Sequence, residues 1–325
     1  MEYLLVKLKP RSFFHIGERE GWFEGSKIYI SSDTIFSALC HCHLLLYNEV
    51  DSFIESFCSS EPPFLISSAF PYWDSNLYFP LPKNQFIRDD KLKKIAFVNL
   101  KLLLRLLEGE AIEDLQEEIS LDPELDYLPR LYLQENPKPH LPWIVENIPR
   151  VALNRFTNHP GENFFFFGQV KYLENAGLFI LVHIKKKEWA KKIKALFRLL
   201  SEEGLGGDRS SGKGLFYPPE FHTIEIKKIP GANSSYAASV YFPTSSELGN
   251  LAKSFYQLEL RRGYIYSPAN KSYRRRSIRV FTEGSIFPGL NRVGTLVDIT
   301  PEIFKVHRIY RYGLLFSIPC KMEER

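Results

Sequence analysis

The segment of residues 204–216 constrains the fold of this chain most, because five of its first eleven residues are glycine. It follows residues 187–203, where an apolar stripe with lysines on the other face predicts an amphipathic helix. It precedes residues 221–229, which alternate like a strand. One glycine is enough to end a helix, so five indicate a loop whose backbone makes close contacts.

The preceding elements place this loop in a β-α-β-β-α-β order. Residues 3–9 alternate as a strand, and a helix that Ser32 or Asp33 can cap follows. Residues 163–173 and 178–184 predict two strands joined as a hairpin. The order is that of a ferredoxin-like (RRM-like) domain, an antiparallel sheet with two helices on one face. We therefore expect an α+β fold.

The length of 325 residues favours two domains, and we expect them to be tandem ferredoxin-like domains. The first is residues 1–228, with a proline-rich helical insertion at about 61–149 and predicted helices at about 91–107 and 112–119. The second is residues 229–325. Its predicted elements are a strand near 236–242, a helix at 246–255, a long hairpin with arms 256–266 and 274–282, and a strand at 310–318.

Positive charge is concentrated in the last third of the chain. Residues 221–325 carry 16 Lys or Arg against 8 Asp or Glu, whereas residues 1–220 carry 26 against 30. This asymmetry suggests a polyanionic partner, although a solvated basic face explains it equally well. No apolar run approaches the roughly 20 residues of a membrane helix, and the opening residues lack signal-peptide features, so we expect a cytoplasmic protein without a membrane partner.

The four cysteines are too few and too clustered for a disulfide framework, and we expect reduced thiols. Cys40-His41-Cys42-His43 suggests zinc, but on a helix these side chains point in four directions about 100° apart. At most two of them can share an ion. We therefore expect neither a metal site nor another cofactor.

The glycine-rich segment is the first candidate binding site. Glycines let successive backbone N–H groups approach a phosphate, and two cationic side chains add charge; the alternative is a flexible turn. The candidate residues are Gly204, Gly206, Gly207, Arg209, Ser210, Ser211, Gly212, Lys213 and Gly214. Gly207-x4-Gly212-Lys213 matches the phosphate loop of nucleotide hydrolases except at its last position, which is Gly214 instead of Ser or Thr. The segment also follows a helix instead of a strand, so we do not expect an ATPase.

The long hairpin of the last third is the second candidate. It interleaves basic and aromatic residues, which neutralise phosphates and stack on unpaired bases of single-stranded RNA. A solubilising edge hairpin is the alternative. The candidate residues are Arg262, Tyr264, Arg274, Arg275 and Arg276. His15, where the first strand ends, can stack on a base, bind a phosphate or act as a general base, or be an ordinary loop histidine.

Four segments together resemble the RAMP superfamily of CRISPR RNA-binding proteins. They are residues 204–216, the Phe14-His15-Ile16-Gly17-Glu18 segment, the helix start at residues 32–39, and Arg150-Val151-Ala152-Leu153-Asn154-Arg155-Phe156-Thr157. Within the superfamily, the length, Tyr78-Phe79-Pro80-Leu81-Pro82-Lys83 and a second domain after the glycine loop are similar to the fourth Csm subunit of type III-A effector complexes.

That resemblance implies a non-catalytic subunit. Such a subunit grips the 5′ handle of CRISPR RNA and joins the large polymerase-nuclease subunit to the backbone RAMP subunits. It adds Gly17 and Arg155 as expected RNA-binding residues.

Two other functions stay open. One is a metal-independent RAMP-family endoribonuclease that processes precursor CRISPR RNA with His15 or His41 as general base; such enzymes usually carry their glycine loop near the C-terminus, unlike this chain. The other is a protein-only scaffold with a basic docking hairpin.

Overall fold

The computed structural model describes residues 1–19, 22–59, 61–90, 92–121, 127–129, 141–154, 156–157, 159, 164–267 and 273–322. The α-helices are α1 (Ser32–Tyr47), α2 (Asp51–Cys58), α3 (Leu100–Leu107), α4 (Gln116–Leu121) and α6 (Trp189–Glu203). No helix of this described part is long and apolar enough to span a membrane. The fold is mixed α+β, with antiparallel pairing throughout the assigned sheets.

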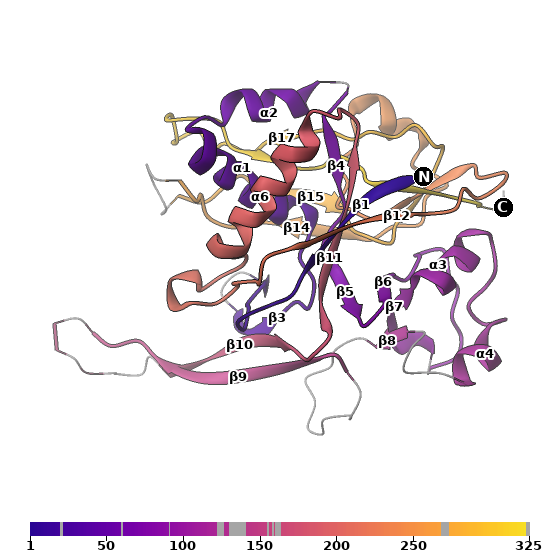
Figure 1. Ribbon diagram of the computed structural model, residues 1–325, viewed down its shortest axis with the longest axis horizontal. Helices are drawn as coiled ribbons and strands as arrows, with labels where there is room; N and C mark the ends of the chain where they lie inside the picture. The colour runs from indigo at the N-terminus through magenta and orange to yellow at the C-terminus, as the bar shows by residue number, and fades with distance from the viewer. Residues whose placement is uncertain are drawn as a thin grey trace.

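An eight-stranded sheet forms the centre of the molecule (Figure 1). Its order is β12-β1-β11-β5-β6-β7-β8, and β4 also pairs with β11. The strands at the start of this order are β12 (Glu220–Glu225), β1 (Glu2–Leu8), β11 (Ala176–Ile184), β4 (Phe64–Ile66) and β5 (Phe70–Trp73). Together with α1 and α6, they follow one another along the chain as strand, helix, strand, strand, strand, helix, strand, which contains the predicted order with one strand added.

The predicted hairpin between residues 163–173 and 178–184 is wrong. The first of these segments, β10 (Phe164–Tyr172), pairs with β9 (Trp143–Val151) as a separate two-stranded sheet, whereas β11 pairs with β1, β4 and β5. The physical reason is that β11 is a nearly continuous apolar run, buried on both faces, and needs a partner strand on each side. Figure 1 shows β9 and β10 as a long arm beside the main body. A further small pair is β2 (Gly17–Arg19) with β3 (Trp22–Ser26).

The region predicted as a helical insertion contributes strands to the central sheet. Besides β4 and β5, these are β6 (Asn76–Pro80), β7 (Ile95–Asn99) and β8 (Tyr127–Pro129). The helix predicted from residue 91 begins only at Leu100, because β7 comes first and Asn99 then caps α3. The Asn99 side-chain oxygen accepts a hydrogen bond from the Leu102 backbone N–H at 2.8 Å.

The last third of the chain, in its described residues 229–267 and 273–322, contains short strands and no α-helix. Where a helix was predicted at 246–255, a short 3₁₀ turn, η3 (Ser245–Asn250), is capped by Thr244 and Glu247. The predicted basic hairpin is present. Its arms are β14 (Leu258–Arg261) and β15 (Ile278–Phe281). The other strands are β13 (Ser234–Ala237), β16 (Ile286–Pro288), β17 (Val297–Asp298), β18 (Tyr310–Arg311) and β19 (Ser317–Cys320).

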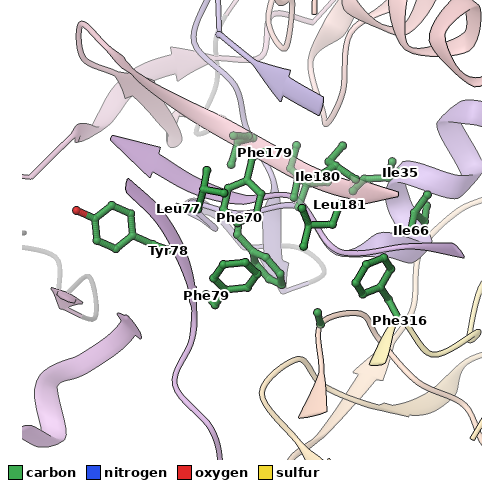
Figure 2. Close-up of a cluster of buried hydrophobic side chains, with 14 of the residues drawn as sticks. Ile35, Ile66, Phe70, Leu77, Tyr78, Phe79, Phe179, Ile180, Leu181 and Phe316 are labelled. Carbon is green, nitrogen blue, oxygen red and sulfur yellow. The ribbon is translucent and has the colours of Figure 1, made fainter. Parts of the chain in front are cut away.

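One hydrophobic core joins the last third to the central sheet. Figure 2 shows Phe316 beside side chains of the sheet, and both belong to the same buried cluster. Polar contacts also cross the junction: Tyr236 donates from its hydroxyl to the Pro80 carbonyl at 2.6 Å, and the Ser32 hydroxyl accepts the Val240 backbone N–H at 3.1 Å. A packed core resists deformation, so groups on the two parts are held in a defined geometry.

Candidate nucleic-acid interface

The glycine loop folds back on itself and on the segment that follows β1. The backbone N–H of Gly214 donates to the Phe13 carbonyl at 2.8 Å, and that of Gly207 donates to the His15 carbonyl at 2.9 Å. Within residues 204–214, six backbone N–H groups donate hydrogen bonds to other protein groups. They are those of Gly204, Leu205, Gly207, Ser211, Gly212 and Gly214. The predicted cradle of successive free amides is therefore wrong for most of the loop, because these donors already hold its shape.

Two glycines of the loop are required by close backbone approach. A Cβ at Gly206 would lie 2.5 Å from the His15 carbonyl oxygen, and one at Gly214 would lie 2.0 Å from the Leu205 carbonyl oxygen. Both residues also have φ in the left-handed region, +95° and +76°. The glycines therefore place the loop edge against His15.

A cleft of about 670 Å³ lies between this loop edge and the basic hairpin. Segments far apart in the sequence meet there, because the common core holds the last third against α1. The lining from the first part of the chain is His15, Ile16, Gly17, Lys27, Ser31, Thr34, Gly206 and Gly207. The lining from the last third is Glu259, Leu260, Arg261, Arg262, Gly263, Arg275 and Arg311. Five of these side chains are cationic and one is a carboxylate, so the cleft suits an anion.

A buried ion-pair network supports the cleft floor. Asp33, in the first turn of α1, pairs with both Arg261 and Arg311. Although burial alone would raise it, the two guanidinium groups hold the pKa of Asp33 below its usual value. Glu259 pairs with Lys27 at 2.7 Å and with Arg261 at 3.1 Å. These carboxylates neutralise part of the positive charge and fix the arginines in place.

Two lining arginines have no carboxylate partner among the described residues, Arg262 and Arg275. Burial, followed by the nearby charge of Arg311, lowers the pKa of Arg275 to about 10, so it remains a cation at neutral pH. Its Nη2 lies 3.5 Å from the Arg262 carbonyl oxygen. The uncompensated charge of the cleft therefore comes from the hairpin.

His15 lies beside the base of the β9–β10 arm. Its Nδ1 is 2.7 Å from the Gly168 carbonyl, which fixes Nδ1 as the donor in the neutral ring, and its ring centroid is 4.3 Å from that of Phe167. Burial and the positive charges of Lys213 and Arg150 lower the pKa of His15, against the effect of the Gly168 bond. The ring is therefore neutral at pH 7.

An ion cluster ties the glycine loop to the same arm. Asp208 of the loop pairs with Arg150 at 2.6 Å and with Lys213 at 3.5 Å. Both cations also lie over the ring of Phe167, at 4.6 and 4.4 Å from its centroid. Lys213 is thus buried and occupied with protein groups, which differs from its predicted role as a loop cation open to RNA.

The structure brings six of the predicted site residues to the cleft: His15, Gly17, Gly206, Gly207, Arg262 and Arg275. Other candidates lie elsewhere. Gly204 and Gly214 are buried, Ser210, Ser211 and Gly212 form a turn at the surface, and the guanidinium of Arg209 lies over the ring of Tyr266.

On the hairpin, Arg274 stacks on Tyr264, and Arg276 lines a separate hollow with Phe304 and His307. Arg155 lies outside the described residues. Cys42 belongs to the core, and His43 contacts the Glu49 carbonyl at 2.6 Å.

The candidate residues predicted from the sequence do not include Lys27, Ser31, Arg261 or Arg311, which also line the cleft. Arg261 is next to the predicted Arg262 in the sequence. Because side chains alternate between the two faces of strand β14, Arg261 points toward Asp33, and this orientation follows from the pairing of β14 with β15. Arg311 lies outside the basic hairpin, and its sequence carries no signal of this role.

Comparison with known proteins identifies relatives for the whole chain. The Csm4 proteins of the CRISPR system in Methanocaldococcus jannaschii and Thermococcus onnurineus are 26% and 24% identical to it. The first match covers 93% of this chain and 89% of the relative, and the second covers 99% and 98%.

Solved structures share the fold. A chain of the Csm3-Csm4 subcomplex in the type III-A CRISPR-Cas interference complex matches with a TM-score of 0.65, 20% identity and coverage of 99% of this chain and 100% of that one. A chain of the Csm1-Csm4 cassette in complex with cA4 matches with a TM-score of 0.61, 20% identity and full coverage of both.

Family models divide the chain between two descriptions. The CRISPR Csm4 C-terminal domain matches residues 231–320, and the RAMP superfamily matches residues 11–217, more than half of the chain. The predicted resemblance is confirmed: this chain belongs to the RAMP superfamily.

Proposed function

We propose that this chain is a non-catalytic RNA-binding subunit of a type III-A CRISPR effector complex, and that its cleft holds the 5′ handle of CRISPR RNA. The observation that carries the proposal is the cleft itself, where the glycine-loop edge of the first part of the chain faces the two uncompensated arginines of the hairpin. Arginine guanidinium groups bind phosphates in any sequence context, which suits a strand backbone. The names of the relatives support the membership of a Csm complex.

We also propose the partners that the resemblance implied, the large polymerase-nuclease subunit and the backbone RAMP subunit. The solved structures of the Csm1-Csm4 cassette and of the Csm3-Csm4 subcomplex support both, because Csm4 occurs there with Csm1 and with Csm3. The division into residues 1–228 and 229–325 is also part of this proposal, with the first part ferredoxin-like. The second part, in its described residues, lacks the two helices of a ferredoxin-like domain. The separate family matches at residues 11–217 and 231–320 support a boundary near residue 229.

Removing the two uncompensated arginines will weaken RNA binding. In Arg262→Gln/Arg275→Gln, affinity for handle-bearing RNA should fall at least about tenfold, because two charge-assisted phosphate contacts disappear. The slope of log K against log salt should become shallower by about 0.7 to 1 for each lost contact. Electrophoretic titration of the full chain at several salt concentrations measures both.

A matched control removes the same charge elsewhere. Lys191 and Arg198 are exposed on α6 and do not line the cleft. Lys191→Gln/Arg198→Gln should bind RNA with nearly unchanged affinity. Equal losses in the two double variants would show that only net charge matters, which would contradict binding in the cleft.

The position of His15 favours one alternative, the endoribonuclease. Its neutral imidazole lines the cleft, and its Nε2 is not the atom that bonds to the Gly168 carbonyl. Cleavage of RNA with His15 as general base would also need a general acid and a ribose 2′-hydroxyl positioned next to the ring. Under the proposed function, repeat RNA incubated with the protein in EDTA will stay intact. Discrete products that vanish in His15→Ala would establish the endoribonuclease instead.

A further inference from the structure

Three residues that line the cleft contain a buried polar atom with no hydrogen-bond partner in the described part of the chain. These atoms are Ser31 Oγ, Arg275 Nε and Arg311 Nε. Ser31 is 2% exposed and Arg311 is 6% exposed, and Arg275 is half-buried with its Nε covered. A buried polar atom that lacks a partner destabilises a protein. Three of the eight such atoms in the described residues lie around this one cleft, where a ligand can supply their partners.

The local contacts show why these donors are left over. Arg311 uses Nη1 on Asp33 and Nη2 on the Arg262 carbonyl, at 3.2 Å for the second, and its Nε remains. The guanidinium of Arg275 makes a long contact, 3.5 Å, to the same carbonyl through Nη2, and its Nε also remains. Ser31 occupies the position before α1, yet its side chain makes no capping bond there. Its hydroxyl is therefore a donor that the helix does not use.

The chemistry of the donors selects the ligand. Two guanidinium N–H groups and a hydroxyl can all donate, and the guanidinium groups cannot accept. An anion with several acceptor oxygens satisfies all three, and a phosphate group does so with the charge that arginine prefers. The first turn of α1 adds the positive end of a helix dipole, although Asp33 there already pairs with Arg261 and Arg311.

We propose that Ser31, Arg275 and Arg311 form a subsite that binds one phosphate group of the RNA at the floor of the cleft. The inference rests on the proposed function and deepens it, because it assigns one phosphate to three named residues. Contacts elsewhere in the cleft hold the strand loosely, whereas this subsite fixes its register. The phosphate is either an internal diester or a 5′-terminal monoester, and both present the same oxygens.

Ser31→Ala is the most diagnostic variant. It removes an unpartnered hydroxyl, so thermal unfolding of the free protein should be unchanged or shift to higher temperature. The same variant should bind handle RNA about tenfold more weakly, since a hydrogen bond to a charged phosphate is lost. Opposite signs for stability and affinity distinguish a ligand-binding hydroxyl from a structural one. Lower stability with unchanged affinity would overturn the subsite.

Phosphate-by-phosphate substitution in the RNA locates the partner. If the subsite holds an internal diester, then among handle RNAs that each carry one neutral methylphosphonate, the RNA modified at that phosphate should bind the unmodified protein about tenfold more weakly. Arg275→Gln should lose that positional effect, whereas Arg198→Gln should retain it. RNA with a 5′-phosphate, compared with a 5′-hydroxyl, tests the terminal monoester. A gain in affinity that Arg275→Gln abolishes would assign the subsite to that end.

The outcomes separate this inference from the proposed function. RNA that fails to bind at all contradicts both. RNA that binds through Arg262 and Arg275, with a flat methylphosphonate profile and unchanged binding by Ser31→Ala, contradicts the subsite alone. A single sensitive phosphate whose effect depends on Arg275 supports it.

Discussion

Asp33→Asn will lower the free energy of unfolding by about 3 to 5 kcal/mol, because it leaves two buried arginines without their carboxylate. Asp33 is fully buried at its side chain, and Arg261 and Arg311 are largely buried as well. Asparagine has the same shape but no charge, so the loss reports the ion pairs and not the packing. Urea-induced unfolding followed by circular dichroism measures it.

Asp298→Asn is the matched control. Asp298 pairs with Arg308 at 2.8 Å on the surface, where the Arg308 side chain is 72% exposed. Such pairs contribute about 0 to 1 kcal/mol. If the two variants lose equal stability, the buried network does not hold the last third against α1.

The pH dependence of stability in acid should also depend on the ion pairs of Asp33 with Arg261 and Arg311. Because the pKa of Asp33 is lower in the folded than in the unfolded chain, its contribution is complete above the unfolded pKa of about 4. The contribution is lost as pH falls below that value. The stability of Asp33→Asn should therefore depend less on pH in this acidic range than that of the unmodified protein.

Gly214→Ala will destabilise the protein by about 3 kcal/mol, the sum of a left-handed backbone and an overpacked contact. Its φ is +76°, and the new Cβ would meet the Leu205 carbonyl oxygen at 2.0 Å, so backbone must move. The loop edge at Gly206 and Gly207 should shift with it. Affinity for handle RNA should fall together with the melting temperature.

Gly212→Ala separates strain from crowding in the same loop. Gly212 has a similar φ of +80°, but no atom of the described residues lies within 4 Å of the position that a Cβ would take there. Gly212→Ala should therefore lower the free energy of unfolding by only about 1 to 2 kcal/mol, the cost of a left-handed backbone at a residue with a Cβ. Equal destabilisation by the two substitutions would mean that the contact between Gly214 and Leu205 is unimportant.

Much of the local structure could be predicted from the sequence. The periodicity of residues 187–203 predicted α6, and the alternation of residues 3–9 predicted β1, because these patterns reflect burial on one face of an element. The glycines of residues 204–214 predicted a loop of close backbone contacts, which the approach of Gly206 to His15 confirms. The prediction that most backbone N–H groups of this loop are free to bind a phosphate was wrong. They donate to protein carbonyls, and a pattern of glycines does not show which acceptor each N–H group meets in the folded chain.

Strand pairing needed the tertiary structure. The Phe164-Phe165-Phe166-Phe167 run and the next strand are close in sequence, so a hairpin was the local expectation, yet β11 pairs with β5, roughly a hundred residues away in the chain. The partner of β10, strand β9, contains a proline, and Trp143 is its only buried residue, so neither strand propensity nor burial marks it clearly.

The sequence by itself determined the helices α1 and α6, the glycine loop and the basic hairpin, since the backbone preferences and periodicity of neighbouring residues decide these elements. Only the tertiary structure decided the cleft. Asp33 meets Arg261 and Arg311 across 228 and 278 residues of chain, and burial of a common core brings them together. Long-range contacts of this kind depend on the packing of the whole chain, which no local pattern records.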